Sequence, residues 1–168
     1  MLISPTMAKA IHDQIGREFG AFLQYVAIAA HFDGQSLPQL AAHFSRQAEE
    51  EREHAMRFIR YLIDAGAPVV IPAVAAPQAA FATAEEAVAL SLRWEQEVTR
   101  QIHGILELAL RENDYTTQQF LQWFVEEQLE EVSSMDKLLS VVRRAGEGGL
   151  LLVEDYLARA REDTGAKD

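Results

Sequence analysis

Apolar residues recur at intervals of three and four along almost the whole chain, and only a few turn and proline signals interrupt this helical periodicity. Ser4 before Pro5, Ser36, and the capping box from Thr83 to Glu86 are typical of helix N-termini. No alternating pattern of the kind found in β-strands competes with these signals. The sequence therefore predicts an all-α protein with helices over about residues 5–32, 37–65, 84–113, 115–146 and 150–162.

The segment between the second and third expected helices, residues 67–82, differs from the other connections. It holds Pro68, Pro72 and Pro77 among small and apolar residues and carries no charge. It is too long for a hairpin and too apolar for a free linker, so we expect a crossover along the surface. Four long helices with one long crossover are typical of a four-helix bundle. The 168 residues fit one domain, with a short fifth helix and a tail that frays from about residue 163.

Each of the four long helices places one glutamate near the middle of its apolar stripe when successive residues are set about 100° apart. These residues are Glu18, Glu51, Glu95 and Glu131. Glu53, in contrast, lies on the solvated face of the second helix and needs no special explanation. Four helices packed by their apolar stripes would bring the four inward carboxylates together.

Four carboxylates inside one bundle need compensation from outside the chain. An isolated buried carboxylate costs several kcal/mol, and the inward faces offer no lysine or arginine to pair with it. Two divalent cations would neutralise four carboxylates, and His54, one turn after Glu51, adds a nitrogen ligand. Carboxylate oxygens with a single imidazole suit iron or manganese better than zinc or copper. The alternative is a set of protonated or mutually bridged structural acids.

Charge and cysteine content exclude several classes of function. The formal net charge of −11, from 26 acidic and 15 basic residues, argues against nucleic acid as a main partner and permits cations. The absence of cysteine excludes disulfides, thiolate metal sites and catalytic thiols. The N-terminal residues lack the pattern of a signal peptide, and no apolar run approaches the ~18 residues of a membrane span. We therefore expect a cytoplasmic protein without membrane contacts.

Four segments make the sequence resemble the bacterial non-haem ferritins over about residues 5–162. They are REFGAFLQY around Glu18, QAEEEREHAMRF around Glu51 and His54, WEQEVTRQI around Glu95, and FLQWFVEEQLEEV around residues 127–131. A Glu-x-x-His motif alone is weakly specific, whereas the full set in this order is highly specific. The resemblance implies a ferritin-like four-helix bundle that binds two iron ions.

By this resemblance, Glu18, Glu51 and His54 hold the first iron, and Glu51 bridges to the second. Glu95 ligates the second iron, with Gln128 close by.

The resemblance also implies roles for residues around this centre. Glu131 would be shared between the centre and a third metal site. That third site would also use Glu50, Glu127 and Glu130. Tyr25 and Trp123 would donate electrons. The alternative for both aromatic residues is core packing.

Haem is not expected, because the sequence departs twice from the bacterioferritins. Those proteins carry a second Glu-x-x-His on the fourth helix, where this chain has Gln128 to Glu131 without a histidine. Their haem-ligating methionine corresponds to Arg52, and Met56 is expected to be a packing residue. The remaining histidines have no partner at ligand spacing and are expected at the surface or at helix ends; they are His12, His31, His43 and His103.

The resemblance implies a ferroxidase that oxidises Fe²⁺ with O₂ or H₂O₂ and stores the ferric product as mineral. Storage would take place in an octahedral cage of 24 identical subunits, whose acidic inner wall would attract iron. Leu129 on a polar helix face, the apolar crossover and residues 150–153 suggest buried subunit contacts.

Three alternatives remain open. The same fold occurs in di-iron and di-manganese oxidases that act on an organic substrate, which usually have longer chains. A metal-free structural or signalling bundle is a second alternative, although the inward glutamates argue against it. A DNA-protecting mini-ferritin, the third, usually has a basic tail and places its metal site between subunits.

Overall fold

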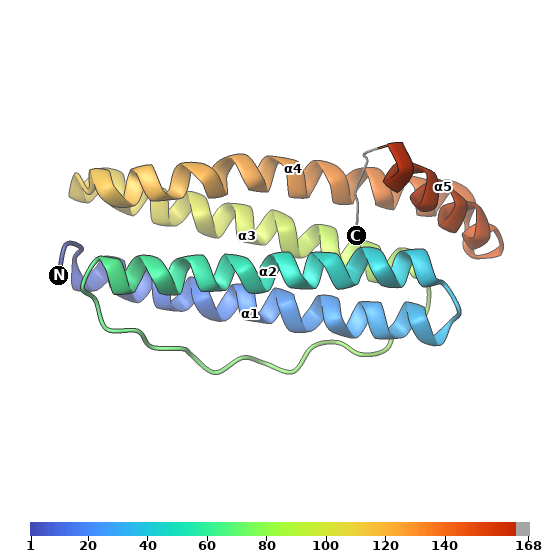
Figure 1. Ribbon diagram of the computed structural model, residues 1–168, viewed down its shortest axis with the longest axis horizontal. Helices are drawn as coiled ribbons and strands as arrows, with labels where there is room; N and C mark the ends of the chain where they lie inside the picture. The colour runs from blue at the N-terminus through green and yellow to red at the C-terminus, as the bar shows by residue number, and fades with distance from the viewer. Residues whose placement is uncertain (164–168) are drawn as a thin grey trace.

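The computed structural model describes residues 1–163, so the tail that the sequence predicts to fray lies outside the described residues. The described part confirms the predicted all-α fold, a four-helix bundle with a short C-terminal helix (Figure 1). None of its helices is both long and apolar enough to cross a membrane. The elements are α1 (Pro5–Gly34), α2 (Pro38–Asp64), α3 (Ala84–Glu112), α4 (Tyr115–Ala145), the 3₁₀ turn η1 (Glu147–Gly149) and α5 (Leu150–Asp163).

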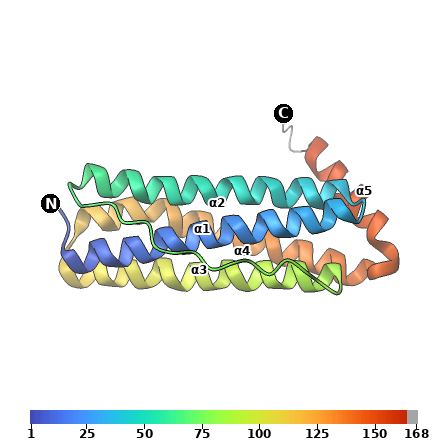
Figure 2. The same ribbon diagram turned by 90° about the horizontal axis from the view of Figure 1, so that it is seen from below.

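The long helices form two antiparallel pairs, α1 with α2 and α3 with α4 (Figure 1), and each helix packs mainly against its partner in the pair. The segment between α2 and α3 runs the length of the bundle, across α1 and then along α3, so α2 and α3 point in the same direction (Figures 1 and 2). The predicted surface crossover is confirmed. At the far end of the bundle, η1 turns the chain so that α5 packs against both α2 and α4.

Two contacts fix the crossover on α1. The buried amide of Gln24 pairs with the backbone of Gln78, donating to its carbonyl at 2.9 Å and accepting from its N–H at 3.0 Å. Gly16 allows the ring of Pro72 to approach the helix so closely that a β-carbon on Gly16 would collide with it.

Side chains cap three helices where the sequence has cap signals. The hydroxyls of Ser4 and Thr83 each accept a hydrogen bond from the backbone N–H three residues later in the sequence. The carboxylate of Asp114 accepts one from the N–H of Thr117 in the same way. The prediction that Ser36 caps α2 was wrong. Ser36 has a left-handed backbone, with φ of 59°, and Leu37 occupies the cap position without a side-chain bond.

Acidic residues from the C-terminal part of the chain supply the caps that local sequence does not. The Glu154 carboxylate of α5 accepts from the first N–H groups of α2, those of Gln39 at 2.7 Å and Leu40 at 2.8 Å. The Glu147 carboxylate of η1 accepts from the N–H of Ala84 at the start of α3, also at 2.8 Å. A negative charge at a helix N-terminus is favourable, so these contacts hold the C-terminal elements on the bundle.

The apolar core is divided into two clusters along the bundle axis. One includes Tyr25, Phe32 and Phe44, and the other includes Phe58 and Phe124. The sequence positions of the inward glutamates fall between the two clusters on every long helix. The fold therefore encloses a polar layer in the middle of an otherwise apolar core.

Candidate metal centre

Six predicted site residues lie in this polar layer, and none is more than 6% exposed. They come from all four long helices, which confirms that the glutamates of the apolar stripes point inward. The residues are Glu18 of α1, Glu51 and His54 of α2, Glu95 of α3, and Gln128 and Glu131 of α4.

Glu18, Glu51 and His54 form the tightest group of potential ligands. One ligand atom from each lies within 4.8 Å of the others. Nδ1 of His54 is 3.4 Å from Oε2 of Glu51 and 3.9 Å from Oε2 of Glu18. These three atoms, together with Oε1 of Glu51, are buried without a hydrogen-bond partner. Buried polar atoms are normally paired, so the group has the donor set and the unmet coordination that suit a divalent cation.

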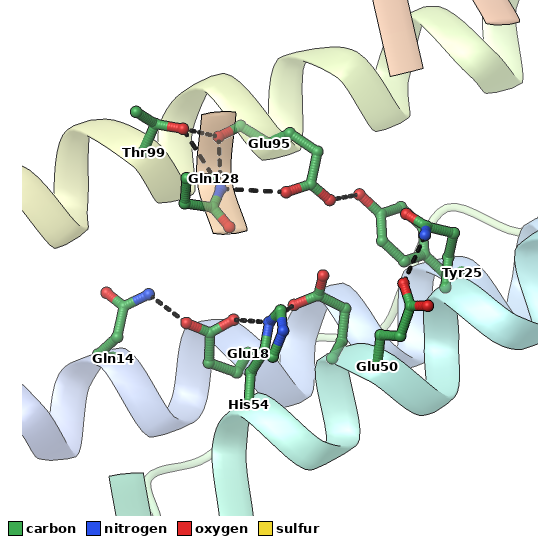
Figure 3. A network of polar contacts seen from close by, with 10 residues as sticks. Gln14, Glu18, Tyr25, Glu50, His54, Glu95, Thr99 and Gln128 are labelled. Carbon is green, nitrogen blue, oxygen red and sulfur yellow. Dashed lines mark hydrogen bonds and ion pairs between the residues drawn. The ribbon is translucent and has the colours of Figure 1, made fainter. Parts of the chain in front are cut away.

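Glu95 is bound differently, because protein donors already reach its carboxylate. The hydroxyl of Tyr25 donates a short hydrogen bond to Oε1, and Nε2 of Gln128 donates to Oε2 at 3.2 Å (Figure 3). The same Gln128 nitrogen also approaches the Glu95 carbonyl and the hydroxyl of Thr99. Glu95 is thus held in place without a cation, whereas Glu51 is not.

The four buried carboxyls resist ionisation together. Burial is the main cause that raises the pKa of Glu18, Glu51 and Glu95 above the usual range. The charge of Glu51 raises the pKa of Glu18 further, and the charge of Glu95 does the same for Glu51. Burial and then the charge of Glu95 raise the pKa of Glu131 to about 9. The charge of Glu51 is thus coupled to those of both Glu18 and Glu95, as expected of a ligand that bridges two ions.

The residues of the implied third site are less tightly gathered. Glu50 is half-buried and accepts from Nε2 of Gln47 at 2.6 Å. The charges of Glu50 and Glu127 both raise the pKa of Glu131. Glu130 is exposed and lines, with Glu50, an open cavity of about 990 Å³ between α2, α4 and α5. Among the side chains that the structure describes, those of residues 1–161, only the group of Glu18, Glu51 and His54 has three ligand atoms close enough to hold an ion.

Aromatic rings hold the imidazole of His54 in place. Its ring meets the rings of Trp123 and Phe124 edge-on, at centroid distances of 5.4 and 5.7 Å. The guanidinium of Arg57 lies 3.8 Å above the Trp123 ring centroid. Trp123 therefore contacts a candidate ligand and also packs against the core. Met56, which the sequence predicts as a packing residue, is 46% exposed, so that prediction was wrong.

The other histidines lie apart from the centre. Nε2 of His12 pairs with the carbonyl of Pro68 at 2.8 Å, and His103 is exposed. His31, in the last turn of α1, packs between two phenylalanine rings. His43 is not an ordinary surface residue as predicted: it is half-buried against Phe44, and burial lowers its pKa to about 4.

Sequence reasoning missed the neutral partners of the acids. The fully buried Gln14 donates from Nε2 to Oε1 of Glu18 at 2.7 Å, and Gln47 contacts Glu50. Gln14 lies one turn before Glu18 on the same inward face, and this spacing is the signal that could have identified it.

Comparison with known proteins places this geometry in a family. A model of the ferritin-like domain matches residues 8–145. Ferritin BfrB of Mycolicibacterium smegmatis is 46% identical over 156 residues, covering 93% of this chain and 86% of that protein. The bacterial non-heme ferritin of Staphylococcus aureus is 37% identical over 146 residues, covering 87% and 88%. An open pore ferritin from the archaeon Archaeoglobus fulgidus superimposes with a TM-score of 0.89 at 32% identity, covering 93% and 96%. The chain therefore belongs to the ferritin family, as its resemblance to the bacterial non-haem ferritins predicts.

Proposed function

We propose that this protein is an iron-storage ferritin that oxidises Fe²⁺ at a two-ion centre in the middle of each subunit. Membership of the ferritin family supports iron storage in a cage of identical subunits. The observation that carries the proposal of a centre is the buried group of Glu18, Glu51 and His54, whose facing atoms have no hydrogen-bond partner.

The substrate is Fe²⁺, and the side chains divide its binding between two positions. Oε2 of Glu18, a Glu51 oxygen and Nδ1 of His54 would hold the first ion. The other Glu51 oxygen and Glu95 would hold the second, with Glu131 as a further ligand. Gln128 would stay beside the second ion through its contacts with Glu95.

Either O₂ or H₂O₂ can accept the two electrons that two Fe²⁺ ions supply. Two Fe²⁺ ions lose one electron each, and O₂ takes both electrons with two protons to leave as H₂O₂. With H₂O₂ as the oxidant, the two electrons and two protons break the O–O bond and two water molecules form. The carboxylates favour the Fe³⁺ product because hard anionic oxygens stabilise the higher charge. Tyr25, whose hydroxyl donates a hydrogen bond to Glu95, would supply one of the further electrons that are needed when O₂ is reduced beyond H₂O₂.

The ferric product would pass to the cavity of a 24-subunit cage past the third-site residues Glu50, Glu127 and Glu130. Large apolar side chains outside the bundle core support subunit contacts, since Leu129, Leu151 and Leu152 are each at least 69% exposed. We propose a cytoplasmic location, and we expect no haem because Arg52 occupies the position of the methionine that ligates haem in bacterioferritins.

Rapid mixing of the purified cage with Fe²⁺ in aerated buffer tests the ferroxidase proposal. The wild-type protein should oxidise Fe²⁺ much faster than buffer alone, and Glu51→Ala should remove the rapid phase because it removes the bridge. Glu53→Ala is the matched control, since Glu53 is exposed on the same helix. A Glu51→Ala protein with the wild-type initial rate would contradict the proposal. The native mass of the same sample checks the 24-subunit assembly.

A further inference from the structure

The side chain of Gln14 connects Glu18 of the proposed centre to the surface of the bundle. Gln14 is fully buried and donates from Nε2 to Oε1 of Glu18 at 2.7 Å (Figure 3). Its own Oε1 accepts from Nη1 of Arg17 at 3.3 Å. A hydrogen bond to a metal-binding carboxylate orients it, and here the donor is itself held by Arg17, an exposed residue.

The guanidinium of Arg17 fixes which way the amide of Gln14 faces. Arginine has only donors, so the Gln14 atom that faces Arg17 must be the oxygen. The NH₂ group is then directed at Glu18, where it can only donate. Oε1 of Glu18 thereby accepts a hydrogen bond from the protein, which leaves it less available to a cation than Oε2.

The second oxygen of Glu18 is left for the ion. Oε2 is buried without a partner and lies 3.9 Å from Nδ1 of His54. An ion that took both Glu18 oxygens would have to share Oε1 with the amide of Gln14, which donates to it at 2.7 Å and so makes it the poorer ligand of the two oxygens. Building on the function proposed above, we propose that Gln14, oriented by Arg17, is a positioning residue that makes Glu18 a one-oxygen ligand. The first ion then keeps one more coordination position open for water or oxidant.

The other carboxylates of the centre fit this division of roles. Glu95 is restrained in the same manner, by Gln128 and Tyr25. Glu51 has no hydrogen bond to either oxygen, so it is free to move between the two ions. The chain thus restrains the ligands at the ends of the centre and leaves the bridging ligand unrestrained.

Anaerobic titration with Co²⁺ tests the proposal, because the visible absorption of Co²⁺ reports its coordination number without any turnover. Gln14→Leu removes the amide at similar volume. We expect this variant to bind as many Co²⁺ ions as the wild-type protein, with weaker absorption bands because Glu18 then binds through two oxygens. Its affinity for Co²⁺, or its initial rate of Fe²⁺ oxidation in a separate aerobic assay, should change roughly 10–100-fold. Gln24→Leu is the matched control, since it removes another buried amide of α1 that contacts only the crossover. It should keep the wild-type spectrum.

Arg17→Ala provides a second variant if Gln14→Leu does not fold. Arg17 is exposed, so its removal should leave folding intact while freeing the Gln14 amide to turn, with a smaller spectral change in the same direction. Wild-type spectra and affinities in both variants would overturn the inference while the proposed function stands. Failure of the wild-type protein to bind two Co²⁺ ions per subunit would overturn both.

Discussion

Cation binding at the buried glutamates should release protons at neutral pH, and Glu131 allows the size of this effect to be worked out. Its pKa of about 9 lies two units above pH 7, so the metal-free protein holds this carboxyl protonated. Removing the proton at pH 7 costs about 2.7 kcal/mol, since one pKa unit corresponds to about 1.4 kcal/mol. A cation that needs ionised Glu131 therefore binds roughly a hundredfold more weakly at pH 7 than above pH 9. Glu131 alone should make the affinity rise about tenfold per pH unit in between, and the other buried carboxyls can only make this rise steeper.

The stability of the metal-free protein changes with pH in the opposite direction to the cation affinity. The raised pKa means that between about pH 4.5 and pH 9 the folded state holds a proton that the unfolded state has released. The contribution of Glu131 to the free energy of unfolding is therefore fully present below this pH range and is lost as the pH rises through it. Cation binding reverses the trend, because the bound ion favours the ionised carboxylate.

Calorimetric titration with Zn²⁺, which is redox-inert, measures this release directly. The apparent binding enthalpy at pH 7 should depend on the ionisation enthalpy of the buffer, with at least one proton released per subunit. Glu131→Gln should lower the proton count by about one, while Glu126→Gln, on the exposed side of α4, should leave it unchanged. A binding enthalpy independent of the buffer, or an unchanged proton count in Glu131→Gln, would refute the reasoning.

Three further predictions concern stability, measured by urea unfolding of dissociated subunits. Glu154→Ala should cost about 1–2 kcal/mol because α2 loses its only N-terminal side-chain cap among the described residues; an unchanged midpoint would contradict this. Phe58→Ala should cost about 3–5 kcal/mol, since Phe58 is fully buried and stacks on Phe124 at 4.3 Å; a loss below 1 kcal/mol would count against that packing. Metal-free Glu95→Gln should be less stable than metal-free Glu51→Gln, because Glu95, unlike Glu51, accepts hydrogen bonds from protein donors; the reverse order would show that Glu95 is not held as described.

The inward glutamates were predictable because one rule, the helical period, places a residue on a face whatever its neighbours are. The rule works for Glu51 and Glu95 because long packed helices leave little freedom in which face is buried. It does not give the roles of Gln14 and Gln128. An amide on an inward face can turn to several partners, and only the positions of Arg17 and Glu95 decide the choice.

Helix caps that come from distant parts of the chain could not be predicted from the sequence either. Ser36 has the composition of a cap, but the tight turn before α2 puts its backbone in the left-handed region. Glu154 takes the place of the local cap because α5 folds back onto α2. No local sequence pattern predicts that contact, since Glu154 is more than a hundred positions away from the N–H groups that it accepts from.

Anomalous diffraction at the iron edge, from crystals loaded with Fe²⁺ without oxygen, tests the two-ion centre most directly. We predict two peaks in each subunit, roughly 3.5–4 Å apart as in other two-metal sites. One peak should lie among Glu18, Glu51 and His54, and the other between Glu51 and Glu95, with Glu18 bound through Oε2 alone. A polar layer without iron, or iron only at surface carboxylates, would contradict the proposed centre.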